Sequence, residues 1–295
     1  MRKQKTWQTV LKRTAVIVAA VFAFFPIYWL ISTSFKPFDE WANWPPIWLT
    51  DNPTLQNYRI VFFPELAREF AAQQEGSLDY KVSGSAWNAF KGSAIVSVAA
   101  TIISVAFGTL AAYSIVRFKT GGKNYPFQFL TVRMVPPIAV VVPMVVLFSI
   151  LKLSDTYFGL ILAYSAFTLP FSIWMIRSFI DDVPAELEGA AMIHGMGQFR
   201  AFLTVTLPLV KGGILSTALF IFILNWSEFL FALVLTAGNV VTVTLQVANY
   251  VSASSGKLYG VQAAMGTIST LPVIVFGYMI QRHIVRGLTF GAIKR

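Results

Sequence analysis

The stretch Asp181–Pro208, DDVPAELEGAAMIHGMGQFRAFLTVTLP, lies between two long apolar runs and combines small residues with charges. Asp182 can cap a helix with Pro184 in its first turn, where a missing N–H needs no partner. Gly195 can end that helix by adopting a positive φ, and Pro208 stands where the next apolar run begins. We therefore expect a short helix lying parallel to a membrane, with so little bulk at its centre that another protein can approach it closely.

The composition is typical of a multi-pass membrane protein. Of the 295 residues, 56% are hydrophobic and only 12% are charged, and the mean hydropathy is +0.65. Few soluble domains could keep so much apolar surface out of water. The chain contains no cysteine, which excludes disulfides, thiolate nucleophiles and cysteine-ligated metals. The net charge of +10 does not indicate nucleic-acid binding, because the basic residues gather beside apolar runs as they do in membrane proteins.

Six apolar stretches are long enough to cross a bilayer of roughly 30 Å as helices of about 20 residues. The first is too long for the apolar region of a signal peptide and has no small-residue cleavage site after it, so we expect it to remain in the protein. The sequence thus predicts an all-α membrane protein with six transmembrane helices. These spans are Thr14–Phe35, Ser93–Val116, Phe127–Leu151, Tyr157–Ile180, Gly212–Thr236 and Gln262–Val285.

The distribution of charge indicates the orientation. Five basic residues and no acidic ones precede the first span, whereas residues 36–92 hold seven acids against five bases. Because cytoplasmic segments carry the excess of Lys and Arg, both termini and the Asp181–Pro208 stretch are expected in the cytoplasm. Residues 36–92 then form an extracytoplasmic segment after an N-terminal part of residues 1–35. Residues 93–295 form the core, with five spans, the 181–208 loop, an outer loop at 237–261 and a C-terminal tail.

Polar residues and prolines inside the spans are candidates for a pathway or a subunit interface. Arg133 lies about one turn inside the third span, and either snorkelling to the interface or a buried pairing would accommodate it. Pro136 and Pro170 are expected to break or kink spans three and four beside a pathway, where protein or water can satisfy the freed carbonyls. Asn225 and Glu228 are about one helical turn apart and are expected to face the protein interior. Substrate contact and a structural role both remain open for this pair.

The spacing in the 181–208 stretch resembles the coupling loop of ABC importer permeases, which has the form E-A-A, three residues, G, nine residues, I-x-L-P. Gly189 stands where Glu is usual, Glu188 precedes it, and His194 stands where the sugar branch usually has Asp. An ordinary amphipathic helix between two spans is the alternative interpretation. The resemblance implies contact with an ATPase through Glu188, Gly189, Ala190, Ala191, His194, Gly195, Leu207 and Pro208.

Other passages widen the resemblance to nearly the whole chain. They include Ala111-Ala112-Tyr113 with Arg117-Phe118, Trp226-Ser227-Glu228-Phe229, and the tail from Gly287 to Lys294. In this order they resemble the smaller permease subunit of carbohydrate importers of the maltose type, with the type I importer fold. The resemblance implies a bacterial inner-membrane complex with a second permease subunit, two ABC ATPases and an extracytoplasmic substrate-binding protein. It also implies a second ATPase contact at Gly287, Gly291 and Lys294.

No motif for chemistry is present on the chain itself. Gly121-Gly122-Lys123 lacks the first glycine and the final Ser or Thr of a phosphate-binding loop, so ATP and Mg are expected on the partner chains. With only two histidines, no His-rich metal site is expected and no cofactor is assigned to this chain. One alternative is an ion-coupled secondary transporter that titrates Glu228, and another is a membrane-embedded enzyme, which would need a catalytic constellation. The substrate stays open among sugars, oligosaccharides, polyols and sugar derivatives.

Overall fold

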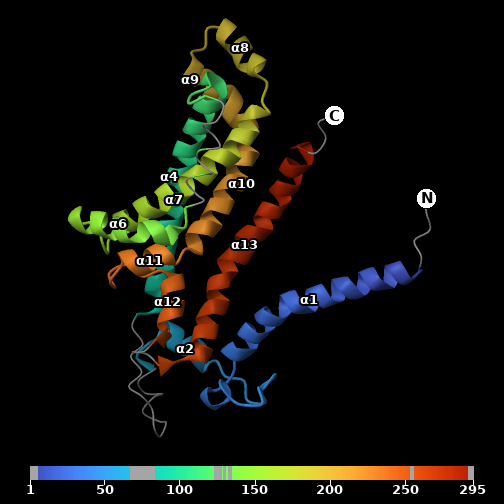
Figure 1. Cartoon of the computed structure of the whole chain (residues 1–295), viewed down its shortest axis with the longest axis vertical. Coiled ribbons are helices and arrows are strands. Elements are labelled where there is room, and N and C mark those ends of the chain that lie inside the picture. Colours follow the sequence, from blue (N-terminus) through green and yellow to red (C-terminus); the bar gives the residue numbers. More distant parts are fainter. Residues whose placement is uncertain are drawn as a thin grey trace. The chain divides into compact units, whose positions relative to one another are not determined.

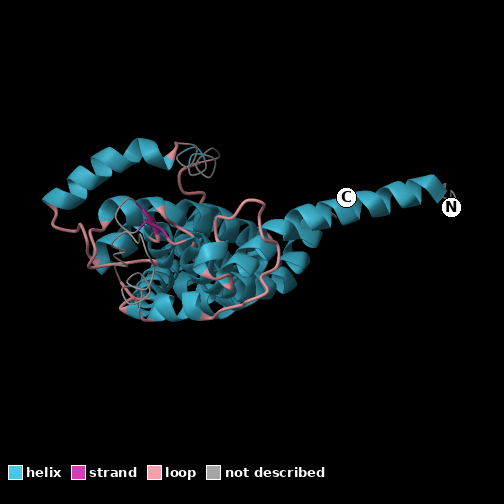
Figure 2. Cartoon of the chain, turned by 90° about the horizontal axis from the view of Figure 1, so that it is seen from below, coloured by secondary structure: helices cyan, strands magenta, loops and turns pink. Residues whose placement is uncertain are grey.

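The computed structural model describes residues 6–66, 84–122, 128, 131, 135–252 and 256–291. Within these residues the regular secondary structure is helical, with loops between the helices, apart from one pair of short strands (Figure 2). The exception is a two-stranded antiparallel ribbon formed by Val251–Ser252 (β1) and Gly256–Lys257 (β2) in the segment expected to be an outer loop. The predicted all-α class is confirmed.

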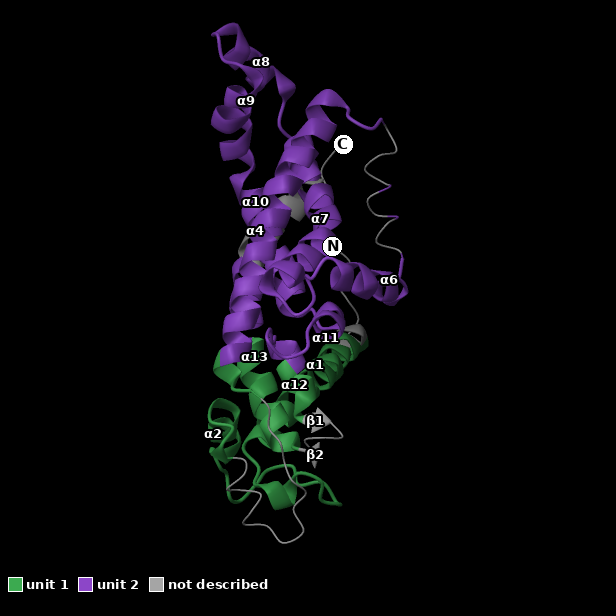
Figure 3. Cartoon of the chain, turned by 90° about the vertical axis from the view of Figure 1, so that its left-hand side faces the viewer, with its two compact units in different colours: residues 1–87, 246–270 green, residues 88–245, 271–295 purple. Residues whose placement is uncertain are grey.

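The chain divides into two compact units, which Figure 3 shows in different colours. Unit 1 comprises Met1–Trp87 and Gln246–Thr270, and unit 2 comprises Asn88–Leu245 and Leu271–Arg295. The long helix α13, Tyr259–Gly291, contributes its first turns to unit 1 and the rest to unit 2. The short helix α12, Val243–Asn249, also crosses the boundary in sequence.

Unit 1 is organised around the end of its first helix. It contains α1 (Thr6–Ser34), a 3₁₀ turn at Phe38–Glu40 and the short helix α2 (Gln56–Phe62). The buried Asn57 side chain of α2 donates to the carbonyl oxygens of Ser34 and Lys36, each at 2.9 Å. Carbonyls at a helix end have no partner within the helix, so this amide stabilises the end of α1.

Unit 2 is built on three long helices that run side by side, α4, α7 and α10 (Figure 1). Two apolar clusters join them: one contains Leu160, Tyr164 and Phe231, and the other contains Ile176 and Phe202. The described helices of this unit are α4 (Ala86–Phe118), α6 (Pro137–Ile150), α7 (Tyr157–Asp181), α8 (Ala185–Ile193), α9 (Gln198–Ala201), a π-helical turn η2 (Phe202–Thr206), α10 (Leu207–Trp226) and α11 (Leu230–Leu235).

Among the described residues, five helical segments are long and apolar enough to cross a membrane, as expected for a multi-pass membrane protein. The predicted third span, Phe127–Leu151, corresponds to α6, a shorter apolar helix of 14 residues. The rest of that span lies largely outside the described residues, and so does Arg133. The five segments are Val10–Ser34, Ala86–Phe118, Tyr157–Asp181, Gln198–Trp226 and Tyr259–Met279.

The prolines act differently from the prediction. Helix α7 continues through Pro170, so the predicted break of the span at this position is wrong. Helix α6 likewise continues through Pro143. A proline removes one hydrogen bond from a helix, but tertiary packing can hold the remaining turns. Pro136 is the N-cap of α6 and Pro137 is its first residue, a position where the missing N–H is no loss.

The fifth predicted span differs most from the structure. Helical structure begins at Gln198 rather than Gly212, and α10 ends at Trp226 rather than Thr236. Pro208 is the second residue of α10, as expected for a proline at the beginning of a helix, but helical residues precede it from Gln198 onward. The π-helical turn η2 ends two residues before this proline, and such wide turns occur where the regular hydrogen-bond ladder of a helix is interrupted.

Candidate functional site: the loop between α7 and α10

Helix α8 begins at Ala185 with Pro184 as its N-cap residue. The prediction that Asp182 caps this helix is wrong, because α7 extends to Asp181 and Asp182 is the C-cap residue of α7. Glu186 and Glu188 fall in the first turn of α8, where the positive end of the helix dipole favours acidic side chains.

The end of α8 follows the prediction. Gly195 adopts φ +87°, a left-handed conformation that glycine takes without steric cost. Its N–H donates to the Met192 carbonyl at 2.9 Å, and the Met196 N–H donates to the Ala191 carbonyl at 3.2 Å. This pair of bonds is a Schellman motif, so the glycine is required by the backbone turn that ends the helix.

Helix α8 lies at one end of unit 2, beyond the ends of α4, α7 and α10 (Figure 1). Most of its surface is open: Ile193 is 86% exposed, and Ala190, Met192 and His194 are also exposed. A Cβ atom added at Gly189 would meet nothing within 4 Å. The small-residue centre of the loop therefore faces free space, as the coupling-loop interpretation requires.

One side chain of α8 is directed inward. The Glu188 side chain is only 2% exposed, and its carboxylate accepts hydrogen bonds from four other side chains. Oε2 accepts from the Tyr113 hydroxyl at 2.7 Å and from Gln198 Nε2 at 3.2 Å. Oε1 accepts from Arg117 Nε at 2.9 Å and from the Thr206 hydroxyl. We call these five residues the Glu188 cluster.

The Glu188 cluster keeps its carboxylate charged. Burial alone would raise the pKa of Glu188, but the hydrogen bonds from Thr206, Tyr113 and Arg117, together with the positive charge of Arg117, outweigh burial and lower this pKa below its usual value. Arg117 also donates to the carbonyl oxygen of Val183 at 2.9 Å, in the link between α7 and α8. A charged pair with its donors and acceptors satisfied is stable where an isolated buried charge would not be.

Aromatic rings pack beside the Glu188 cluster. The Tyr113 ring lies 4.4 Å from the Phe202 ring, centroid to centroid, and the Tyr113 hydroxyl also accepts from Gln198 Nε2 at 2.7 Å. In the sequence, Tyr113 and Arg117 belong to a passage that carries the family resemblance, and nothing there connects them to Glu188. The only available signal was the absence of any acid near Arg117 in its own loop, which leaves that cation to pair elsewhere.

The remaining predicted coupling residues lie at both ends of this region. Leu207 packs against the apolar cluster that contains Tyr113, whereas Pro208 is exposed. Gly287 and Gly291 lie in the last turns of α13, and Lys294 lies outside the described residues. The contacts of these three with an ATPase stay a prediction.

Asn225 and Glu228 do not share one helix face, because α10 ends between them. Asn225 is buried and its Nδ2 donates to Thr101 Oγ1 of α4 at 3.2 Å. The Glu228 carboxylate accepts from the backbone N–H groups of Leu230 at 3.0 Å and Phe231 at 3.1 Å. It therefore caps α11. Asn225 is buried and Glu228 is half-buried, and the helix predicted to continue through both residues ends at Trp226.

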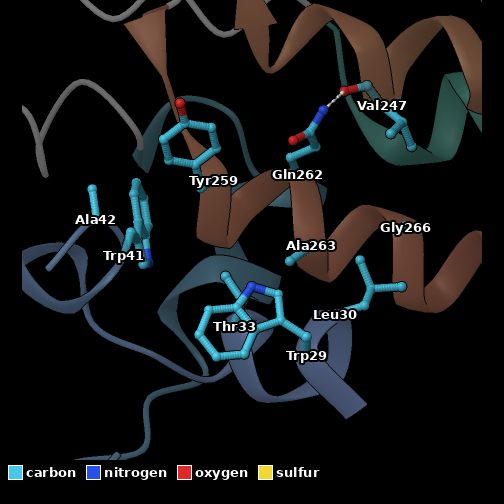
Figure 4. Close-up of a pocket in the computed structure, with 10 residues that line it drawn as sticks. All are labelled: Trp29, Leu30, Thr33, Trp41, Ala42, Val247, Tyr259, Gln262, Ala263 and Gly266. Carbon is cyan, nitrogen blue, oxygen red and sulfur yellow. Dashed lines mark hydrogen bonds between the residues drawn. The ribbon is translucent and has the colours of Figure 1, made fainter. Parts of the chain in front are cut away.

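Unit 1 contains a separate cavity of about 440 Å³ (Figure 4). The indoles of Trp29 and Trp41 border it, and Gln262 turns its amide nitrogen to the Val247 carbonyl at 3.2 Å. The walls are almost entirely apolar, and the indole N–H of Trp41 already donates to the Lys36 carbonyl at 3.0 Å. The lining residues are Trp29, Leu30, Thr33, Trp41, Ala42, Val247, Tyr259, Gln262, Ala263 and Gly266.

No cluster in the described part of the chain has the ligands for a metal: three or more His, Cys, Asp or Glu side chains come together nowhere in it. The architecture is that of a multi-pass membrane subunit that carries an exposed, small-residue helix at one end of its long helices. These features define the class of multi-pass membrane proteins that have an exposed short helix between two long apolar helices.

Comparison with known proteins identifies the family. Residues 104–290 match the family described as the binding-protein-dependent transport system inner membrane component, and the chain belongs to this family. The trehalose transport system permease protein SugB of Mycobacterium tuberculosis is 33% identical over 92% of this chain and 93% of its own length. The trehalose/maltose transport system permease protein MalG of Thermococcus litoralis is 31% identical over 97% and 99%. The predicted resemblance to sugar ABC transporter permeases is confirmed.

A solved structure supports the fold. The crystal structure of a bacterial ABC transporter that imports the acidic polysaccharide alginate contains a chain that superposes with a TM-score of 0.73. The match covers 96% of this chain and 98% of the other at 17% sequence identity. The chain thus has the fold of an ABC importer permease.

Proposed function

We propose that this chain is the transmembrane permease subunit of a binding-protein-dependent ABC importer for a carbohydrate or a related polyol or sugar derivative. The observation that carries the proposal is the match over residues 104–290, which includes the loop with its exposed α8. The relatives named for trehalose, maltose and diacetylchitobiose support a sugar as the substrate class.

The proposed topology has six spans, with both termini and α8 in the cytoplasm. Five spans are the long apolar helices, and α6 forms part of the sixth. The excess of basic residues before α1 and after the last span supports this orientation. In this proposed topology the chain spans a bacterial inner membrane, and α8 lies on the cytoplasmic side, where ATP is available.

The proposed mechanism is mechanical coupling. ATP, with Mg, binds to two partner ATPase subunits, and their closure moves α8 and rocks the neighbouring spans between inward and outward openings. A second permease subunit completes the pathway, and a soluble binding protein delivers the sugar from outside. Gly287, Gly291 and Lys294 in the C-terminal tail form a second ATPase contact, and the 237–261 segment faces the binding protein.

The alternative of an ion-coupled carrier that titrates Glu228 finds no support in the comparisons. The Glu228 carboxylate caps α11 through backbone N–H groups, which is a structural use of the side chain. A carrier would also work without an ATPase. Whether an ATPase co-purifies with this chain therefore distinguishes the two functions.

The test is association with an ATPase. Gly189 is the best site for a bulky probe, because its Cβ direction is open and its backbone is helical. Gly195 is less suitable, because any side chain there would strain a positive φ. The Gly189→Trp variant is expected to insert normally but to lose most of the ATPase that co-purifies with the wild-type chain.

Ser154→Trp, in an exposed turn between α6 and α7, is the matched control and is expected to retain the ATPase. If the wild-type chain brings down no ATPase under gentle conditions, or if Gly189→Trp retains it fully, the coupling assignment of this loop is wrong.

A further inference from the structure

We propose that Glu188 is the positioning residue of the coupling loop: its carboxylate fastens α8 to the end of α4 and to the start of the α10 helical path, so that these elements move together. This inference rests on the proposed function. It assigns Glu188 to force transmission inside this chain and not to contact with the ATPase.

The first argument is that α8 has no other deep attachment. Glu188 is the buried residue of this nine-residue helix, while Gly189 and Ala191 are half-buried and the rest are exposed. A helix that docks a large apolar face is held by its core, whereas α8 has no such face. Its position relative to the spans therefore depends on the Glu188 cluster.

The second argument is the set of elements that the carboxylate joins. Tyr113 and Arg117 lie at the end of α4, 75 and 71 residues away in sequence. Gln198 is the first residue of α9, and Thr206 ends the π-helical turn before α10. A carboxylate has about four acceptor positions, and four donors fill them here. No acceptor position is left for an ATPase.

The third argument concerns the other face of α8. Glu186, Ala190 and Ile193 are exposed, and Ile193 is 86% exposed. With 3.6 residues per turn these three positions lie roughly opposite Glu188, so the surface offered outward combines an acidic, a small and an apolar residue. Docking and positioning are thus divided between opposite faces of one short helix. A change at Glu188 should alter what α8 transmits while leaving the surface that meets the ATPase in place.

The experiment uses the whole importer, purified through this chain and reconstituted in proteoliposomes with its binding protein. The variants are Glu188→Gln, Arg117→Gln, the double variant with both changes, and the conservative Arg117→Lys. Three quantities are measured: the ATPase that co-purifies, the rate of ATP hydrolysis, and the substrate transported per ATP hydrolysed. Maltose and trehalose serve as the transported probes.

Both single variants are expected to keep the ATPase and to hydrolyse ATP, while the substrate transported per ATP falls on the order of 10-fold. The double variant should be no worse than either single one, because both changes remove the same contact. Arg117→Lys keeps the positive charge but not the several N–H donors of the guanidinium group, so it should transport more than Arg117→Gln and less than wild type.

Asp182→Asn and Lys119→Gln remove the same charges from exposed positions close by and are expected to behave as wild type. An unchanged ratio of transport to hydrolysis in both single variants would overturn the proposal. A loss of complex that accounts for all of the lost transport would overturn it too, since Glu188 would then serve folding alone. A wild-type chain that binds no ATPase would instead refute the proposed function, on which this inference rests.

Discussion

Two carboxylates near opposite ends of α10 are held in different ways. Glu188 receives its hydrogen bonds from side chains on α4, α9 and η2, one of them 75 residues away. The Glu228 carboxylate receives bonds mainly from backbone N–H groups two and three residues further along its own chain, with the Tyr164 hydroxyl of α7 beside it. The first carboxylate joins distant elements, and the second shapes a local turn. Which donors a carboxylate collects thus decides whether it transmits force or only ends a helix.

The free energy that each carboxylate contributes to the stability of its helix should differ as well. Removing one member of a buried ion pair leaves the other charge without compensation and costs about 3–5 kcal/mol. Removing a side chain that caps a helix typically costs about 1 kcal/mol. The comparison can therefore be tested by replacing each carboxylate in turn and measuring which helices then exchange their amide hydrogens faster.

The largest effect is expected for Glu188→Ala. Arg117 would lose its charged partner, and α8 would lose the one buried residue it has, so the local opening free energy should fall by about 3 kcal/mol. Amide hydrogen exchange in α8 and α9 should accelerate by roughly a hundredfold, while exchange in α11 stays unchanged. Exchange in α8 at the wild-type rate would show that the Glu188 cluster does not hold this helix.

A smaller effect is expected for Glu228→Ala, and at the other end of α10. The first N–H groups of α11 would lose their acceptor at a cost of about 1 kcal/mol, which accelerates exchange in α11 roughly fivefold. Exchange in α8 should not change. The Thr244 hydroxyl, which donates to the Glu228 carbonyl at 2.7 Å, should keep the turn itself in place. Equal acceleration at both ends would remove the distinction between the two carboxylates.

The same contrast explains what could be predicted from the sequence. Local rules found the loop: the spacing of small residues and the positive φ at Gly195 depend on neighbouring positions alone. The inward direction of Glu188 could not be read in this way, because Arg117 and Tyr113 precede it by more than 70 residues. Most of the long apolar helices were also found, since hydropathy over about 20 residues is a local signal.

The end of α10 was missed for a related reason. The residues Trp226 to Phe229 contain no glycine or proline, so hydropathy continued the span to Thr236. In the structure the chain turns there because the Glu228 side chain caps α11 and the Thr244 hydroxyl from α12 binds the Glu228 carbonyl. A turn that depends on capping and on a later helix gives no signal in the composition of the span. Tertiary contacts decided this boundary.

The smallest effect is expected for a third carboxylate, Asp155, which resembles Glu228 in its use of backbone donors. It accepts from the N–H groups of Asn239 at 3.1 Å and Val240 at 3.2 Å and so ties the turn before α7 to the loop after α11. Burial would raise the pKa of Asp155, but backbone hydrogen bonds from residues 237–240 outweigh burial and lower it.

A lowered pKa in the folded state means that this contact stabilises the protein above the ordinary pKa of aspartate and that the stabilisation is lost as the pH falls through the lowered value. Asp155→Asn should therefore reduce the free energy of unfolding at pH 7 by about 0.5–1 kcal/mol, and the difference from wild type should shrink below about pH 4. Thermal unfolding in detergent at pH 7 and pH 3.5 measures this difference. A difference that grows as the pH falls would mean that Asp155 is held in its protonated form, and its role as an ionised acceptor of these backbone N–H groups would be wrong.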